Sequence, residues 1–212
     1  MIVTIDGPAG SGKSTVARQL ANRLGFEFLD TGAMYRVVGL LWSRGEHTDE
    51  AAIHVANIVR IEFQHGHVLA DGHDVTDAIR TAEASEVASR VAAIPAVRES
   101  MVCLQRAAAE NTDIVTEGRD QGTVVFPHAE RKFFLSAAPE ERARRRFEDL
   151  KSQQTYGELE ITESDVLRQI LERDERDQTR EVAPLVPADD AVIIDTTNVD
   201  VETVIQQLLE RI

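Results

Sequence analysis

Cysteine, aromatic residues and positive charge are all scarce in this sequence of 212 residues. The single cysteine, Cys103, excludes a disulfide within the chain and any cysteine-based metal site. Its apolar neighbours lead us to expect a small buried side chain there. No apolar run reaches the ~20 residues that a membrane-spanning helix needs. Because the chain also starts directly in a predicted strand, we expect a cytoplasmic protein without membrane contact.

Acidic residues outnumber basic ones by 37 to 23, which gives a formal net charge of −14. This charge argues against a nucleic-acid polymer as partner, because the chain has no general basic field. Hydrophobic residues make up 42% and charged residues 28%, as in a soluble globular protein. The placement of arginine is then informative, because an acidic protein that binds anions must gather its cations locally.

A phosphate-binding motif follows the first predicted strand. Residues 7–14 have the sequence Gly-Pro-Ala-Gly-Ser-Gly-Lys-Ser, which fits the pattern G-x-x-x-x-G-K-[ST]. The apolar strand before it and the helical pattern after it supply the setting in which this motif binds a nucleoside triphosphate. Backbone N–H groups would surround the phosphates at the positive end of the helix. We expect Lys13 to reach the β- and γ-phosphates and the Ser14 hydroxyl to bind Mg²⁺.

Short apolar segments alternate with helical patterns along most of the chain. Strands are expected at 2–6, 26–29, 113–117, 131–136 and 191–195. Helices are expected at 14–24, 32–44, 99–110, 139–151 and 164–180, with a last helix from about residue 200. This alternation predicts an α/β protein with a doubly wound, five-stranded parallel sheet and helices on both faces. Ligands in such sheets bind at the carboxyl ends of the strands.

Two stretches depart from this alternation. Residues 60–76 contain short apolar runs around Asp71-Gly72, a strong hairpin-turn signal, so we expect a small inserted antiparallel meander. A helix at about 82–93 should follow it. Residues 151–160 are polar and lack periodicity, which predicts a mobile loop.

Charged residues cluster at three places where a ligand could bind. Thr31 is a candidate helix cap after the second strand, and Arg36, one turn later, is either solvated or a phosphate ligand. After the third strand, Arg119 and Asp120 either pair with each other or face a ligand. The last set shares one helical face and could be an ion-pair ladder or an anion site: Arg173, Asp177 and Arg180.

Together these motifs resemble those of bacterial cytidylate kinases (CMP kinases), in the nucleoside monophosphate kinase group. The resemblance covers essentially the whole chain. It rests on six ordered motifs: Ile5 through Thr15, Asp30 through Arg36, Ala78 through Thr81, Glu117 through Pro127, Pro139 through Arg146, and Arg173 through Leu185. It implies a P-loop NTPase fold and transfer of the γ-phosphoryl group of ATP to CMP or dCMP, with Mg²⁺, giving ADP and CDP or dCDP.

The resemblance also implies a division of labour within a single domain. Residues 1–30, 113–141 and 161–212 would form the core, residues 31–112 would bind the monophosphate, and residues from about 142 to 160 would form a lid. The residues implied to bind ATP are Gly7, Pro8, Ala9, Gly10, Ser11, Gly12, Lys13, Ser14, Thr15 and Arg145.

The acceptor site that the resemblance implies combines phosphate-binding arginines, side chains that recognise cytosine and contacts to the sugar. Arg36, Arg119 and Arg180 would bind phosphate. Its full set is Thr31, Tyr35, Arg36, Ser89, Arg98, Arg119, Asp120, Arg173, Asp177 and Arg180. The implied catalytic residues are Lys13, Arg119 and Arg180. One departure is Gln121, which stands where the family usually has an apolar residue and could alter base or sugar preference.

Two alternatives stay open from the residues alone. A kinase of the same fold could use another acceptor, such as AMP, UMP or a small metabolite. A guanine-nucleotide switch would also bind a triphosphate, but the chain contains no Asn-Lys-x-Asp motif to recognise guanine. We expect a monomer, because no exposed coiled-coil stripe is apparent.

Overall fold

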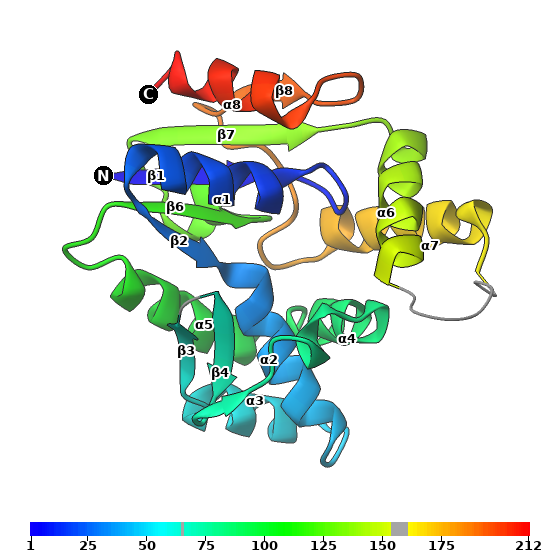
Figure 1. Ribbon diagram of the computed structural model, residues 1–212. Helices are drawn as coiled ribbons and strands as arrows, with labels where there is room; N and C mark the ends of the chain where they lie inside the picture. The colour runs from blue at the N-terminus through cyan, green and yellow to red at the C-terminus, as the bar shows by residue number, and fades with distance from the viewer. Residues whose placement is uncertain (65, 154–160) are drawn as a thin grey trace. The chain divides into compact units, whose positions relative to one another are not determined.

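The computed structural model describes residues 1–64, 66–153 and 161–212 (Figure 1). The chain divides into two compact units: Met1–Phe28 with Thr112–Ile212, and Leu29–Asn111. Most of the polar segment predicted to be a mobile loop, residues 154–160, lies outside the described residues. Within the described ranges, no helix is both long enough and apolar enough to cross a membrane.

The central sheet has five strands in the order β2-β6-β1-β7-β8. Their bounds are Ile2–Asp6 for β1, Glu27–Asp30 for β2, Ile114–Gly118 for β6, Arg131–Ser136 for β7 and Val192–Asp195 for β8. Strand β1 pairs in parallel with β6 and β7, and β7 pairs in parallel with β8. These observations confirm the predicted α/β fold and its five-stranded parallel sheet.

The two faces of this sheet differ in chemistry. Because side chains alternate along a strand, Val3 and Ile5 of β1 point to one face. There they join an apolar core with helices α1 (Lys13–Leu24) and α8 (Val201–Leu209). The intervening residues on the other face are polar and buried: Thr4, Asp6, Thr116 and Lys132. A single π-helical turn, η2 (Gln121–Val125), lies against β1 on this side.

Two further helices complete this unit. Helix α6 (Pro139–Gln153) packs against α7 (Glu163–Thr179) through a small apolar cluster centred on Ala143, Val166 and Ile170. Helix α7 begins with a capping box, in which Thr162 and Asp165 satisfy each other's backbone N–H groups. The C-terminal end of α7 carries the charged residues that the sequence singled out.

The second unit combines four helices with a small antiparallel sheet. The helices are α2 (Thr31–Ser43), α3 (Asp49–Ile58), α4 (Ala82–Val91) and α5 (Pro95–Ala108). The strands are β3 (Ile61–Gln64), β4 (His67–Ala70) and β5 (His73–Asp74), and a 3₁₀ turn, η1 (Ala78–Arg80), follows them. Asp71 and Gly72 have φ angles of 50° and 79°, as a tight turn between β4 and β5 requires. The predicted meander is confirmed.

Several local predictions were wrong. Asp30, not Thr31, caps α2, because its carboxylate accepts the Ala33 N–H at 2.8 Å. Cys103 is exposed, since α5 buries the side that carries Val97 and Met101 instead. Helix α5 also begins earlier than expected, at Pro95, where a missing N–H is tolerated. Helix α3 was not anticipated.

A substitution in the apolar core should lower the stability of the fold and leave the polar face of the sheet unchanged. Ile205 on α8 is fully buried in the core. We expect Ile205→Ala to lower the free energy of unfolding by roughly 2–5 kcal/mol, because it removes buried methyl groups and leaves a cavity. Urea denaturation would measure the loss. The exposed neighbour Gln206 supplies the control, and an equal effect of Gln206→Ala would contradict the assignment of this face.

Candidate active site

The phosphate loop follows β1 and is pressed against two neighbouring elements. Gly7 has a φ of 155°, and a Cβ there would lie 2.2 Å from the backbone oxygen of Leu135 in β7. Gly10 has a φ of 77°, and a Cβ there would lie 3.0 Å from Cβ of Arg142 in α6. Contact with the backbone excludes a side chain at Gly7, and the backbone conformation disfavours one at both positions.

Lys13, the first residue of α1, is buried at the base of this loop with 6% of its surface exposed. Its Nζ donates to the Pro8 carbonyl at 3.1 Å and lies 3.9 Å from Oε2 of Glu117. Burial lowers the pKa of Lys13, and the nearby Arg119 lowers it further. Anionic phosphates beside this group would favour its charged form. Ser14, by contrast, is exposed at the first turn of α1.

Arg142 connects the phosphate loop to α7. It is 3% exposed, and its guanidinium donates to the backbone oxygens of Ala9 at 3.1 Å and Ala137 at 2.9 Å. Its Nη2 also lies 2.6 Å from Oδ2 of the buried Asp174. An arginine that the sequence grouped with the lid is therefore fixed inside the unit.

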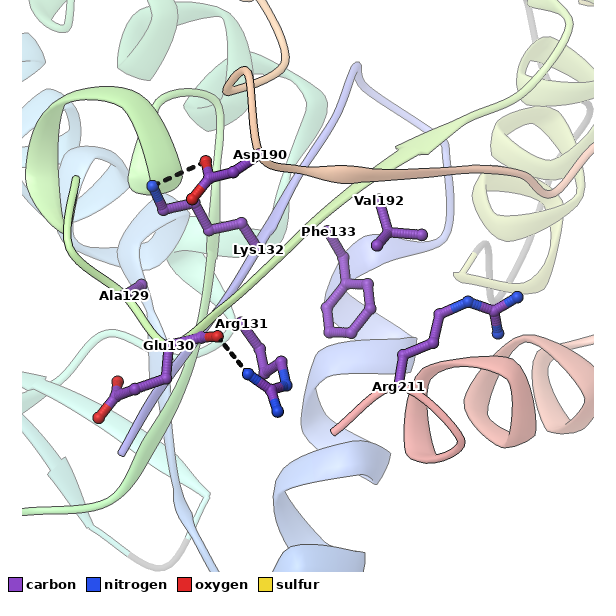
Figure 2. Close-up of a pocket in the computed structure, with 8 residues that line it drawn as sticks. All are labelled: Ala129, Glu130, Arg131, Lys132, Phe133, Asp190, Val192 and Arg211. Carbon is purple, nitrogen blue, oxygen red and sulfur yellow. Dashed lines mark hydrogen bonds and ion pairs between the residues drawn. The ribbon is translucent and has the colours of Figure 1, made fainter.

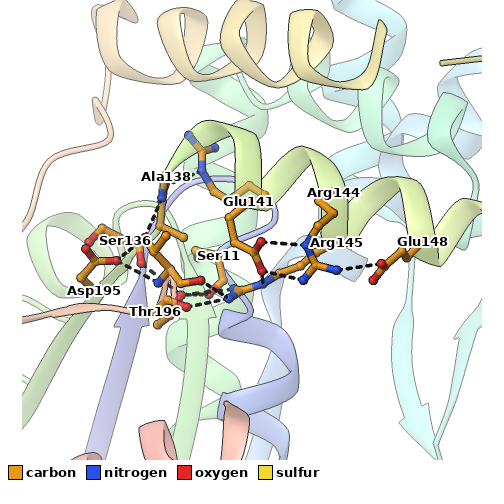
Figure 3. Close-up of polar contacts among 12 residues, drawn as sticks. Ser11, Ser136, Ala138, Glu141, Arg144, Arg145, Glu148, Asp195 and Thr196 are labelled. Carbon is orange, nitrogen blue, oxygen red and sulfur yellow. Dashed lines mark hydrogen bonds and ion pairs between the residues drawn. The ribbon is translucent and has the colours of Figure 1, made fainter. Parts of the chain in front are cut away.

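Arg145 lies one turn further along α6, beside the end of β8 (Figure 3). Its Nη2 donates to the Thr196 oxygen at 2.6 Å, and its Nε donates to Glu141 at 2.8 Å. The Thr196 hydroxyl in turn donates to the Ser11 oxygen at 3.1 Å. The hydrogen bonds from Arg144 and Arg145 hold the pKa of Glu141 down at about 2. Arg145 is thus linked to the phosphate loop through a single threonine.

Three arginines and two aspartates form a charged cluster at the end of α7. Nε of Arg119 lies 2.9 Å from Oδ2 of Asp177, and Nε of Arg173 lies 3.8 Å from the same oxygen. Burial opposes ionisation of Asp177, but the two guanidinium groups outweigh it and hold its pKa below the usual value. Nη2 of Arg180 lies 3.9 Å from Oδ1 of Asp120. Arg119 and Asp120 therefore have separate partners, and the structure brings all five of these predicted residues into one cluster.

Asp6, the last residue of β1, holds the turn that carries Arg119 and Asp120. Its Oδ1 and Oδ2 accept the backbone N–H groups of Gln121 and Gly122, both at 2.8 Å. Burial raises the pKa of Asp6 to about 7, against the lowering effect of these two hydrogen bonds. The sequence alone does not predict a role for this residue. A charge at the end of an apolar strand was the only signal.

Gln121 points inward, with 1% of its surface exposed. Its Oε1 accepts a hydrogen bond from the Thr116 hydroxyl at 2.9 Å, and its side chain packs against Gly118. The polar face of the sheet explains why an amide is accommodated at this buried position. Any effect of Gln121 on base or sugar choice would have to act through the shape of the turn.

The other residues that were predicted to bind the acceptor lie in the second unit. Thr31, Tyr35 and Arg36 project from α2, and Nη2 of Arg36 lies 3.3 Å from Oδ1 of Asp30. Ser89 on α4 and Arg98 on α5 are buried. The Arg98 guanidinium lies 5.9 Å from the centre of the Tyr35 ring. Helices α4 and α5 both contact α2, so the fold of this unit brings these positions onto neighbouring helices.

Comparison with known proteins decides the family. The sequence model of the cytidylate kinase family matches residues 3–212. The chain belongs to the cytidylate kinase family. The cytidylate kinase of Fervidobacterium nodosum is 49% identical over 98% of this chain and 94% of its own. That of Solibacter usitatus is 45% identical over 99% of this chain and 91% of its own. The protein is therefore a nucleoside monophosphate kinase.

A solved structure supports the fold independently. An uncharacterized protein from Eubacterium ventriosum superposes with a TM-score of 0.55 and 13% identity, over 100% of this chain and 97% of that chain. At this identity the likeness concerns the fold alone.

This kinase also has a hollow of about 340 Å³ (Figure 2). It is lined by residues 129–133, Asp190, Val192 and Arg211. Lys132 in its wall pairs with Asp190 at 2.9 Å and donates to the Pro127 oxygen at 2.6 Å. None of its lining residues belongs to the predicted nucleotide sites, so the hollow adds nothing to them.

The raised pKa of Asp6 predicts how stability depends on pH. Its ordinary value is 3.8 and its folded value is about 7, so the folded kinase binds this proton more tightly than the unfolded chain. The stabilisation is present below about pH 4 and is lost as pH rises through about 7. We expect the free energy of unfolding to fall across this window, with a slope approaching ~1.4 kcal/mol for each pH unit.

Urea unfolding at a series of pH values would measure this slope. Asp6→Asn cannot titrate and should lack the decline between about pH 5 and 7. Carboxylates with a lowered pKa, such as Asp177, change protonation at lower pH and leave the window clear. Parallel curves for the two proteins would contradict the assignment.

Proposed function

We propose that this kinase transfers the γ-phosphoryl group of ATP to CMP or dCMP, giving ADP and CDP or dCDP in pyrimidine nucleotide metabolism. The observation that carries the proposal is the cluster of Arg119, Arg173 and Arg180, each beside an aspartate, in a unit that also holds the phosphate loop. Family membership supports the choice of cytidine nucleotides as acceptors.

The acceptor is a nucleotide phosphate, which is already anionic near neutral pH and needs no general base. Phosphoryl transfer then depends mainly on positioning and on charge stabilisation. Lys13, Arg119 and Arg180 offset the charge of the transferring group. Arginine suits this role because its planar fork binds two phosphoryl oxygens and stays charged.

Ser14 fits Mg²⁺ by its chemistry and its position. Its hydroxyl is an oxygen ligand, and its side chain is exposed at the N-terminal turn of α1, where the metal could keep most of its waters. Mg²⁺ bound to the phosphates supplies charge neutralisation. The other loop residues, from Gly7 to Thr15, bind the phosphates of ATP through backbone N–H groups, and Arg145 contributes from α6.

Acceptor binding divides among side chains of three kinds. We assign the phosphate to Arg36, Arg119 and Arg180 and the sugar to Arg173 and Asp177. We assign recognition of the cytosine edge to Ser89, Arg98 and Asp120. Thr31 and Tyr35 complete the site. Cytosine offers an N4 amino donor to a carboxylate, whereas uracil has an oxygen at the same position.

The proposed division of the chain follows the same roles. Residues 1–30, 113–141 and 161–212 form the ATP-binding core, and residues 31–112 form the monophosphate-binding region. Residues from about 142 to 160 act as a lid that excludes water from the reaction; residues 154–160 of this lid lie outside the described part of the chain. A monomeric, cytoplasmic enzyme stays a prediction from the sequence.

An assay of ADP release with ATP and Mg²⁺ tests the proposal directly. The acceptors are CMP, dCMP, UMP and AMP, with a tube that lacks acceptor as the control. We expect rapid release with CMP and dCMP and little release without acceptor, because water is excluded from the closed site. Equal slow release in every tube would indicate an ATPase and would overturn the proposal.

Asp120 carries the predicted preference for cytosine over uracil. We expect Asp120→Ala to reduce the ratio of kcat/KM for CMP to that for UMP by about 5- to 150-fold, since one well-placed base contact contributes roughly 1–3 kcal/mol of discrimination. Asp174→Ala is a matched control, because Asp174 is also a buried aspartate paired with an arginine. It should lower both rates and keep their ratio. An unchanged ratio in Asp120→Ala would assign base recognition to another residue.

A further inference from the structure

Asp6 occupies the point at which β1 meets the turn after β6. It lies opposite Gly118 in the parallel register of β1 and β6, and Gly7 of the phosphate loop follows it directly. Its side chain is 4% exposed, and each of its carboxylate oxygens accepts one backbone N–H from the start of η2. One buried side chain thus touches the turn of Arg119 and Asp120 and immediately precedes the residues that bind ATP.

The turn needs this outside acceptor. The first N–H groups of any helical turn lack partners within it, and Asp120, which precedes η2, makes no capping bond with its own side chain. Asp6 therefore caps the turn from another strand. Only an ionised carboxylate offers an acceptor to both N–H groups, because an asparagine has one oxygen and would turn its amino group toward the other donor.

A second residue on the same face of β1 also limits the position of the turn. A Cβ added at Gly122 would lie 3.0 Å from Oγ1 of Thr4, so the turn lies close against β1. Gln121 fills the space beneath Gly118 and bonds to Thr116. Arg119 and Asp120 follow Gly118 directly. Arg119 pairs with Asp177 and Asp120 with Arg180, both from the end of α7.

We propose that Asp6 is a positioning residue for the acceptor nucleotide, which holds the Arg119–Asp120 turn in register with the phosphate loop. The inference rests on the proposed function, because it assigns Arg119 and Asp120 to the acceptor. Asp6 itself touches neither nucleotide. It acts through the two N–H groups that it accepts.

The electrostatics of the site agree with a functional role. Burial disfavours the ionised form of Asp6, and the carboxylates of Asp120 in the turn and Glu117 on β6 disfavour it further, so that its pKa is raised to about 7. Lys13, on α1, lies 3.9 Å from Glu117, and Lys132, on β7, packs beside Gly122 of the turn and pairs with Asp190 at 2.9 Å. A buried acid with two acidic neighbours lowers the stability of the fold. Asp6 lies between the phosphate loop and the Arg119–Asp120 turn, and a functional role there explains why the chain carries such an acid.

The test is the kinetics of Asp6→Asn with CMP and with ATP varied separately. A displaced turn should lower kcat/KM for CMP by about 100-fold, the scale of a misplacement of about 1 Å, and should reduce the preference for CMP over UMP. KM for ATP should change less than about twofold. In the parent enzyme, kcat/KM for CMP should rise with pH through about 7, and Asp6→Asn should keep only the part of this rise that comes from ionisation of the CMP phosphate, near about pH 6.

Glu130→Gln is the matched control. Glu130 also accepts a backbone N–H from β1, that of Ile2 at 2.7 Å, but at the opposite end of the strand. Its kinetics should equal those of the parent enzyme. If Asp6→Asn does not fold, Gly122→Ala takes its place, because the added Cβ pushes the same turn from the side of Thr4 while Asp6 stays intact.

The outcomes separate this inference from the proposed function. A parent enzyme without CMP-dependent ADP release would overturn the function itself. An active parent with unchanged CMP kinetics in a folded Asp6→Asn, or with equal losses for CMP and ATP, would overturn the positioning role alone. A selective loss for CMP in either Asp6→Asn or Gly122→Ala supports it.

Discussion

Pairing of buried and partly buried arginines with aspartates is the constraint on which the rest of this kinase depends. Arg119 is held by Asp177, Arg142 by Asp174, and Arg180 lies beside Asp120. A buried guanidinium without a counter-charge would be costly, and the aspartates remove that cost while fixing its direction. Anions would then meet cations that are already oriented, so little reorganisation is needed when they bind.

The two faces of the sheet separate stability from function. One face is apolar and packs on α1 and α8. The other places buried threonines, Asp6 and Lys132 under the turn that carries Arg119 and Asp120. The turn does not pair with the sheet as a strand would, so its backbone needs side-chain hydrogen-bond partners. The polar face supplies them, but it buries less apolar surface than the other face. The loop and the turn can therefore be held firmly where the chain is least hydrophobic.

The sequence predicted what is encoded locally. The phosphate loop, the strands and the Asp71-Gly72 turn depend on short motifs and on hydrophobic periodicity. The partners within the site could not be predicted in this way. Arg119 pairs with Asp177, 58 residues away, rather than with its neighbour Asp120. Periodicity gives the face on which a residue lies and not the element that covers it, which is why the contacts of Asp6 and Arg142 were not anticipated.

The same limit explains the errors of detail. Met101 and Val97 set the buried side of α5, and Cys103 lies off that side although its sequence neighbours are apolar. Asp30 was assigned to neither strand nor cap, yet it ends β2 and caps α2. The carboxylate of Asp30, one residue before Thr31, accepts the N–H of Ala33 at the start of the helix.

The link between Thr196 and Ser11 has a consequence for biosynthesis. The phosphate loop is synthesised before the strand that completes it, because the hydroxyl that contacts its Ser11 oxygen comes from the end of β8, 185 residues later in the chain. The apolar residues that cover α1 also come from α8, close to the carboxyl end. A ribosome-bound chain therefore carries this loop without these contacts until β8 and α8 have been made, because contacts so distant in sequence form only when both segments are available.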